Sequence, residues 1–378
     1  MIQAAYIHIP FCQQICHYCD FNKVFLKDQP VGEYLDSLEQ EMILTLKETP
    51  TKKLHSIFVG GGTPTALSEN QLVHLCEIIQ RQLPVDSETE FTFEANPGDL
   101  NLKKFQILKD AGVNRISFGV QTFNEKLLKK IGRSHRPEDV FQSIDWAKTA
   151  GFENISVDLI YGLPEQTLSD FEETLETAFS LNIPHFSGYS LIIEPKTVFY
   201  NLMKKGKLPL VGEDMEAKMF DTLIDKMAKN GYQQYEISNF SKKGFESKHN
   251  LTYWNNEYYY GFGAGAHSYI NGYRKANYGP LKKYSDPLKN SQLPIMEDHF
   301  VTKEEQMEEE MFLGLRKING VSNATFIMKY GVSPVEYFSK PIKELQERGL
   351  LKIDNDRIYL TKQGIFLGNE VFQSFIGI

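Results

Sequence analysis

Short apolar runs, typical of buried strands, alternate with amphipathic stretches of helical period through the first half of the chain. The expected strands cover residues 6–9, 56–59, 90–94, 115–120, 155–160 and 185–193. The expected helices cover residues 33–48, 69–83, 101–111, 124–131, 137–150 and 168–181. Six repeats of a strand followed by a helix predict a parallel sheet with right-handed crossovers, either an open doubly wound sheet or a partial barrel.

The chemically unusual residues of this half lie where the expected strands end. The run Gly-Gly-Gly-Thr-Pro at 60–64 follows the second strand, and Glu94, Gln121 and Asp158 lie at or just beyond the ends of later strands. In α/β folds this carboxyl edge of the sheet carries the active site. A curved sheet would bring these ends around one mouth, so we predict an α/β fold with a partial (β/α)6 barrel over residues 1–195.

The pattern changes after residue 195. A helix at 213–230 and a strand at 232–238 predict an α/β extension over residues 196–300, in which residues 280–300 are expected to be an irregular connection. From residue 303 the chain is helical again, and the runs 349–353 and 357–361 read as a two-stranded wing after a helix. We therefore predict a small winged-helix-like domain over residues 301–378.

Charge and hydropathy narrow the expected partners. The 378 residues carry a net charge of -8, which argues against binding to a phosphate backbone, so we expect no nucleic-acid partner even for a winged-helix-like domain. No basic, apolar leader opens the sequence, and no apolar stretch approaches the ~20 residues that span a bilayer. The expected location is therefore the cytoplasm, with no transmembrane segment.

Three of the four cysteines lie within eight residues, as Cys12, Cys16 and Cys19, directly after the first expected strand. Clustered thiols in a cytosolic chain indicate a zinc site or an iron–sulfur cluster. Structural zinc usually takes four ligands, and here only His17 or His8 could complete the set. Three thiolates on a cluster would leave one iron without a protein ligand, and an open position on a metal indicates chemistry rather than scaffolding.

The Cys-x-x-x-Cys-x-x-Cys spacing resembles the radical S-adenosylmethionine superfamily. That resemblance implies a 4Fe-4S cluster on Cys12, Cys16 and Cys19, with S-adenosylmethionine chelating the fourth iron. The glycine-rich run at 60–64 is similar to the segment of that family that lies against the methionine end of the cofactor, because glycine lets the backbone approach closely. No Gly-Lys-Ser/Thr follows the run, so it does not match a phosphate-binding loop.

Longer runs resemble one branch of the superfamily, the coproporphyrinogen dehydrogenase-like proteins. They are Tyr-Ile-His-Ile-Pro-Phe-Cys at 6–12, Phe-Glu-Ala-Asn-Pro at 93–97, Gly-Val-Gln-Thr-Phe at 119–123 and Asp-Leu-Ile-Tyr-Gly-Leu-Pro at 158–164. The resemblance covers roughly the first 270 residues. It implies that the cofactor pocket is lined by Tyr6, Tyr18, Gly61, Gly62, Thr63, Glu94, Gln121, Arg133 and Asp158. The chemistry suits these roles, since carboxylates accept from ribose hydroxyls or an ammonium group and arginine pairs with a carboxylate.

Two functions occur within this branch: oxygen-independent oxidation of coproporphyrinogen III, and heme chaperoning. The dehydrogenases have a fourth cysteine two positions after the third, where this chain has Phe21, and a long N-terminal extension, whereas this chain begins almost at its first strand. The run His-Asn-Leu-Thr-Tyr-Trp at 249–254 matches the chaperones' His-Asn-x-x-Tyr-Trp motif. The resemblance therefore favours a chaperone that binds heme and passes it to an acceptor protein. The sequence leaves open whether the cofactor is cleaved.

The motif also suggests how heme could be held. Neutral imidazole is a common axial ligand of heme iron, and aromatic rings pack against the macrocycle. His249 is the candidate ligand, with Tyr253 and Trp254 as walls, and His267 is a weaker candidate. The alternative is a polar loop histidine beside two core aromatic residues.

Overall fold

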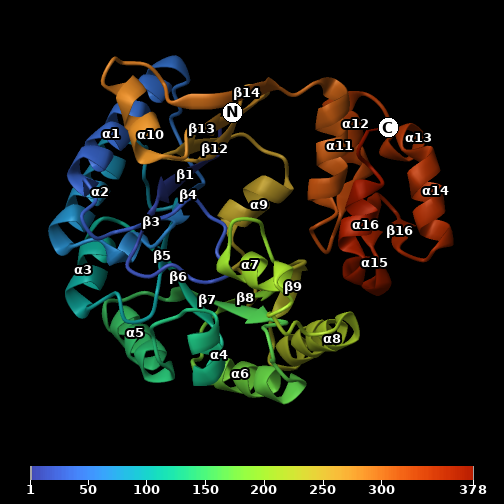
Figure 1. Ribbon diagram of the computed structural model, residues 1–378. Helices are drawn as coiled ribbons and strands as arrows, with labels where there is room; N and C mark the ends of the chain where they lie inside the picture. Colours follow the sequence, from blue (N-terminus) through green and yellow to red (C-terminus); the bar gives the residue numbers. More distant parts are fainter. Residues whose placement is uncertain (1, 378) are drawn as a thin grey trace.

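One sheet of twelve strands runs through most of the computed structural model, which describes residues 2–377 (Figure 1). Its parallel part comprises, in spatial order, β11 (Tyr259–Phe262), β1 (Ala4–Ile9), β4 (Ser56–Gly61), β5 (Glu90–Ala95), β6 (Arg115–Gln121), β7 (Asn154–Tyr161) and β8 (His185–Ser190). Antiparallel strands extend it at both sides: β12 (His267–Ile270), β13 (Tyr273–Asn277) and β14 (Ile295–Phe300) beyond β11, and β10 (Asn239–Ser241) and β9 (Gln233–Glu236) beyond β8. The strand order ends at β14 and β9, so the sheet formed by residues 2–377 is not a closed barrel.

The six predicted strands and the six predicted helices are confirmed, with ends that shift by a few residues. The helices are α1 (Val31–Glu48), α2 (Glu69–Gln82), α3 (Leu102–Asp110), α4 (Glu125–Lys130), α5 (Pro137–Thr149) and α6 (Leu168–Ser180), and α4 and α5 share the single connection from β6 to β7. Ser68 and Thr167 begin α2 and α6 with reciprocal side-chain and backbone hydrogen bonds, which satisfy amide groups that a helix start leaves unpaired.

Side chains along the parallel strands alternate between two kinds of surface, as the two-residue period of a strand requires. On β4, Ile57 and Val59 belong to the main hydrophobic core, beneath the crossover helices. Ser56 and Phe58, which alternate with them, instead contact His249 of the extension. The inner face of the sheet is therefore partly polar, and this face supplies most of the candidate site.

The extension is part of the same sheet. The predicted boundary at residue 195 is not a break in the sheet, because β9 and β10 continue it beyond β8 and β11 lies parallel to β1. Along the chain, α7 (Val198–Lys204) and α8 (Glu213–Lys229) lie between β8 and β9, and α9 (Lys248–Trp254) lies between β10 and β11.

The prediction that residues 280–300 are irregular is wrong. They form α10 (Leu281–Leu288) and the edge strand β14. Local pattern hides both elements, because α10 contains Pro287 and β14 is largely exposed and charged.

The last part of the chain forms a small winged-helix-like unit (Figure 1). The side chains of this unit form a hydrophobic core of their own. Its helices are α11 (Lys303–Gly314), α12 (Asn323–Tyr330), α13 (Pro334–Tyr337), α14 (Ser339–Glu347), α15 (Lys362–Phe366) and α16 (Gly368–Gln373). The predicted wing is present as β16 (Leu351–Asp354) and β17 (Arg357–Leu360), and β15 (Val321–Ser322) makes it three-stranded. Among the described residues, no helix combines the length and the apolar character needed to cross a bilayer.

Candidate functional site

The three clustered cysteines occupy a loop at the carboxyl edge of the sheet. Cys12 ends the short strand β2 (Phe11–Cys12), which pairs with β3 (Val24–Phe25) and so closes the loop at its base. All three thiols are free, Cys12 buried and the other two half-buried. Burial raises the pKa of Cys12 to about 11 and also raises the pKa of Cys19, so metal binding would have to displace thiol protons.

The donor set fits a cluster better than structural zinc. His8 uses both ring nitrogens, one toward the Tyr6 hydroxyl at 2.9 Å and one toward the Asn22 carbonyl at 2.7 Å, so it has none left for a metal. His17 donates through Nδ1 to the Lys130 carbonyl at 2.9 Å. Within residues 2–377 no three ligating side chains converge closely enough to hold a single ion. Thiolates that bind separate irons of one cluster do not need to converge in that way.

The glycine-rich run packs directly against the cysteine loop. Gly61 has φ +103° and donates its amide to Glu94 Oε2 at 2.9 Å, and Gly62 donates to the Ile9 carbonyl at 2.9 Å. A Cβ at Gly62 would lie 2.7 Å from that carbonyl oxygen. The Thr63 hydroxyl lies 3.7 Å from Cys12 Sγ. The lack of side chains at 60–62 is therefore required for β4 to approach β1 and the cysteines this closely.

A chain of side-chain hydrogen bonds links Thr63 to Arg133 at the carboxyl edge of the sheet. Asn96 donates its amide to Thr63 Oγ1 at 3.0 Å and accepts from Arg133 Nη1, while Arg133 Nη2 donates to the Tyr18 hydroxyl at 3.0 Å. Arg133 Nε is buried with no hydrogen-bond partner among the described residues. A guanidinium with an unused donor fits a site for an anionic group, such as the carboxylate of an amino acid.

Two carboxylates, Glu94 on β5 and Asp158 on β7, lie on the inner face of strands that flank β6. Burial, helped by the nearby Asp158 carboxylate, raises the pKa of Glu94 to about 7, although the hydrogen bond from the Gly61 amide acts in the opposite direction. Burial also raises the pKa of Asp158, whose Oδ1 accepts from the Ser117 hydroxyl at 3.4 Å. Neither carboxylate forms a salt bridge within residues 2–377, and two such groups suit a cationic or hydroxyl-rich ligand.

Gln121 and Tyr6 complete the predicted pocket. Gln121 has φ +69° at a bulge between β6 and β7, an uncommon conformation for a residue other than glycine. A Cβ at Gly119 would lie 2.9 Å from both Gln121 Nε2 and Arg133 Nη2, so these two side chains meet above Gly119. Tyr6 stacks on Phe58 with 6.2 Å between ring centroids. The nine residues assigned to the cofactor thus lie along the inner face and carboxyl edge of the parallel strands; their roles stay predictions.

His249 lies elsewhere. It is on helix α9 rather than in a loop, and only 1% of its surface is exposed. Its Nδ1 bonds to Ser56 Oγ at 2.9 Å and its Nε2 to the Tyr253 hydroxyl at 2.8 Å, and its ring stacks on Phe58 at 5.1 Å. Ser56 begins β4, so His249 sits at the amino ends of the strands, away from the cysteines. Burial lowers the pKa of His249 to about 3, so the ring is neutral at physiological pH.

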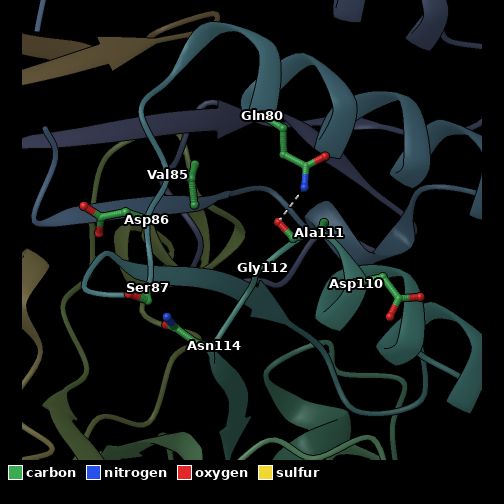
Figure 2. A pocket seen from close by; sticks show the side chains of 8 residues that line it. All are labelled: Gln80, Val85, Asp86, Ser87, Asp110, Ala111, Gly112 and Asn114. Carbon is green, nitrogen blue, oxygen red and sulfur yellow. Dashed lines mark hydrogen bonds between the residues drawn. The ribbon is translucent and has the colours of Figure 1, made fainter. Parts of the chain in front are cut away.

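Two cavities accompany these features. One of about 380 Å³ lies between α9 and α11 and is lined by Tyr253, Trp254, Asn256, Glu257, Tyr259, Arg274, Glu309, Phe312 and Leu313. The other, of about 470 Å³, is formed where α2 and α3 lead into β5 and β6, and there Gln80 donates to the Ala111 carbonyl at 3.1 Å (Figure 2). None of the predicted site residues lines this second cavity, so it does not bear on the candidate site.

Sequence reasoning left out Asn96, which joins Thr63 to Arg133. It lies in the run Phe-Glu-Ala-Asn-Pro at 93–97, but only Glu94 of that run was assigned a role. A polar side chain two residues beyond a strand-end carboxylate was the available signal.

Known protein families and solved structures resemble this chain in sequence or in fold. The radical SAM superfamily model matches residues 6–178, and the HemN C-terminal domain model matches residues 301–367. Heme chaperone HemW of Bacillus subtilis is 57% identical over 377 residues, covering 100% of both chains, and that of Lactococcus lactis is 47% identical, covering 99% of this chain and 97% of the relative. The structure of coproporphyrinogen III oxidase (HemN) from Escherichia coli superposes with a TM-score of 0.87 at 24% identity, over 100% of this chain and 90% of that one, which shows a shared fold. The chain therefore belongs to the HemW family of the radical SAM superfamily.

Proposed function

We propose that this protein is a heme chaperone that binds heme and transfers it to an acceptor protein, and that it carries a 4Fe-4S cluster with exchangeable S-adenosylmethionine. The observation that carries the proposal is the likeness, over the whole chain, to heme chaperone HemW of Bacillus subtilis. Cys12, Cys16 and Cys19 would hold a cluster able to supply an electron for cleavage of S-adenosylmethionine.

In this proposal Cys12, Cys16 and Cys19 hold the cluster and the carboxyl-edge residues hold the cofactor. The unused Nε of Arg133 supports a role for this side chain in binding the cofactor's carboxylate. Glu94 and Asp158 are placed to accept from its ammonium or ribose hydroxyl groups. Gly61, Gly62 and Thr63 supply a backbone without obstructing side chains, and Tyr6, Tyr18 and Gln121 border the same pocket.

Heme is assigned to the region of α9. Tyr253 and Trp254 line the cavity of about 380 Å³ together with Tyr259 and Phe312, and aromatic walls suit a flat macrocycle. His249 remains the predicted iron ligand, and the geometry attaches a condition to that role. Its Nε2 is bonded to the Tyr253 hydroxyl, so ligation through Nε2 requires this hydroxyl to move away.

The alternative is an oxygen-independent coproporphyrinogen III dehydrogenase. Phe21 argues against it, because this residue stands where the resemblance expects the dehydrogenases' fourth cysteine, and its side chain is 59% exposed. The decisive assay is anaerobic incubation with coproporphyrinogen III, S-adenosylmethionine and a reductant. Appreciable protoporphyrinogen would overturn the chaperone proposal, and binding of heme without that product supports it.

The cluster and the heme ligand need separate experiments. Anaerobically reconstituted protein should absorb broadly near ~400 nm from thiolate-ligated iron, and Cys16→Ala should lose that band. Stoichiometric zinc without iron or sulfide would contradict the cluster.

For heme, titrations should compare wild type with His249→Ala and Tyr253→Phe. Tyr253→Phe keeps the ring and frees Nε2, so it should bind heme at least as tightly as wild type. His249→Ala should bind more weakly, with a changed spectrum. Identical affinities and spectra for wild type and His249→Ala would remove His249 as the ligand.

A further inference from the structure

The side chain of Asn22, three residues after Cys19, joins the cysteine loop to a distant part of the chain. Its Nδ2 donates to the Ala264 carbonyl at 2.7 Å and to the Gly279 carbonyl at 2.9 Å. Both carbonyls belong to the extension, in the glycine-rich segment after β11 and in the segment before α10. An amide offers two N–H donors, and here both are used.

The main chain of Asn22 is held from the opposite side. His8 bonds through Nε2 to the Asn22 carbonyl at 2.7 Å, and the Tyr6 hydroxyl lies 2.9 Å from His8 Nδ1. A carbonyl only accepts, so Nε2 carries the proton and Nδ1 accepts from Tyr6. Asn22 is thus fixed at its backbone to β1 and at its side chain to the extension.

Glycines leave room for this side chain. A Cβ at Gly265, where φ is +77°, would lie 3.0 Å from both Cβ and Nδ2 of Asn22. A Cβ at Gly279 would lie 3.2 Å from Asn22 Oδ1. The glycine-rich segment, whose role the sequence did not indicate, therefore forms a socket for Asn22.

The socket is itself anchored by a buried carboxylate on α1. Glu41, only 2% exposed, accepts from the Gly263 amide at 2.8 Å, from Asn277 Nδ2 at 2.6 Å and from the Tyr284 hydroxyl at 2.6 Å. The Tyr34 hydroxyl accepts from the Ala264 amide at 3.1 Å. A fully bonded buried network of this kind holds its members in one arrangement, so Asn22 docks onto a rigid surface.

We infer that Asn22 is a positioning residue for the iron–sulfur cluster: its two side-chain hydrogen bonds to the socket fix the end of the cysteine loop and slow loss of the cluster. This inference rests on the proposed cluster site at Cys12, Cys16 and Cys19. It assigns a function to β11 and the segment after it, which place the Ala264 carbonyl opposite the loop. Preorganised ligands need less ordering when they bind a metal.

The experiment uses full-length protein carrying Asn22→Ala, Asn22→Asp or Gly265→Ala, with Asn70→Ala as control. Asn22→Asp keeps the side chain's size but replaces its donors by acceptors that face two carbonyl oxygens. Asn70 lies on α2, is exposed, and makes no side-chain hydrogen bond in the described part of the chain. Each protein is reconstituted anaerobically, and the absorbance of its cluster is followed in the presence of an iron chelator. Iron and sulfide per chain, and the melting temperature of the cluster-free form, are measured alongside.

Two ordinary hydrogen bonds predict that Asn22→Ala and Asn22→Asp lose the cluster faster than wild type by about tenfold or more. Gly265→Ala should show the same loss from the far side of the contact. Asn70→Ala should match wild type, and the cluster-free forms of both Asn22 variants should melt within a few degrees of wild type. Gly265→Ala also carries backbone strain at φ +77°, so its cluster-free form should melt lower.

Cluster loss at the wild-type rate in both Asn22 variants would overturn the inference. So would recovery of the wild-type rate by Asn22→Asp, which would show that only the volume of the side chain matters. A collapse of cluster-free stability in the Asn22 variants, in step with their cluster loss, would also overturn it. Absence of a cluster from wild-type protein would instead contradict the proposed function.

Discussion

Replacing Gly61 by alanine tests whether the glycine-rich run is required by geometry. Gly61 has φ +103°, which L residues rarely adopt, and a Cβ there would overlap the imidazole ring of His8. His8 has little freedom to move, because it is 4% exposed and bonded at both ring nitrogens. Gly61→Ala should therefore strain the backbone and displace a buried ring.

Two other glycines separate these effects. Gly206 has φ +64° with nothing within 4 Å of an added Cβ, so Gly206→Ala carries the backbone strain alone, about 1–2 kcal/mol. Gly32, in the first turn of α1, has neither a positive φ nor a neighbour within 4 Å, and Gly32→Ala should be neutral or stabilising by up to about 1 kcal/mol. Gly61→Ala adds overpacking of roughly 1–3 kcal/mol to the strain, for a total of about 2–5 kcal/mol.

Thermal melting of the cluster-free proteins measures these differences. At roughly 2 °C per kcal/mol for a chain of this size, Gly61→Ala should lower the melting temperature by about 4–10 °C. Gly206→Ala should lower it by about 2–4 °C, and Gly32→Ala should leave it unchanged or raise it slightly. A drop for Gly61→Ala no larger than that for Gly206→Ala would refute the argument that His8 occupies the space of a side chain.

Four more outcomes follow from the site. Arg133→Lys removes the guanidinium that reaches both Asn96 and Tyr18. S-adenosylmethionine binding, measured by calorimetry on reconstituted protein, should therefore weaken by about tenfold or more. Unchanged affinity would exclude Arg133 from the pocket. Because the pKa of Glu94 is about 7, its carboxylate becomes protonated as pH falls from 8 to 6. Cofactor affinity should therefore fall by up to about tenfold per pH unit below 7. Glu94→Gln should flatten this dependence, and a flat wild-type profile would contradict the role of Glu94. The same raised pKa means that Glu94 makes the cofactor-free protein less stable as pH rises from about 4.5 to about 7, so Glu94→Gln should be relatively more stable at pH 8 than at pH 5 in denaturant melts. His249→Ala leaves the hydroxyls of Ser56 and Tyr253 without their partner and should lower stability by about 3 kcal/mol, clearly more than Tyr253→Phe; equal losses would show that the Ser56 bond contributes nothing.

The repeated part of the fold was predictable because its information is local. Each of β1, β4, β5, β6 and β7 carries its own apolar run, and polar or glycine residues mark its end. The pairing of β11 with β1 was not predictable in that way. Ala4 lies beside Tyr259, and nothing in either segment's own pattern names the other as its neighbour. The extension therefore read as a separate unit when it is in fact a continuation of the sheet.

The candidate site was likewise predictable only where its residues are positioned by local sequence. Strand ends predicted that Gly61, Glu94, Gln121 and Asp158 would lie at one edge, because parallel strands share that edge. His249 had no such anchor, and its place at the start of β4 depends on how α9 packs. Glu90, the first residue of β5, accepts from the backbone amides of Lys248 and His249 at 3.0 and 3.1 Å. A carboxylate is stabilised next to the amino end of a helix, where the helix dipole is positive. The sequence does not show which helix Glu90 will contact.

The separation between the two ends of the strands bears on the choice between chaperone and dehydrogenase. From Ser56, which bonds His249, to Gly61 beside the cysteine loop, β4 rises by five residues at about 3.3 Å each, or about 17 Å. Radical oxidation of a tetrapyrrole needs van der Waals contact between its propionate side chains and the cleaved cofactor. The two regions are nevertheless linked through Phe58, whose ring stacks on His249 and on Tyr6, with 5.1 and 6.2 Å between ring centroids. Carriage of heme needs no such contact, because binding and release depend only on the ligand and the walls beside α9. Heme bound at α9 with its propionates out of contact with the cofactor would therefore favour carriage over oxidation as the role of that site.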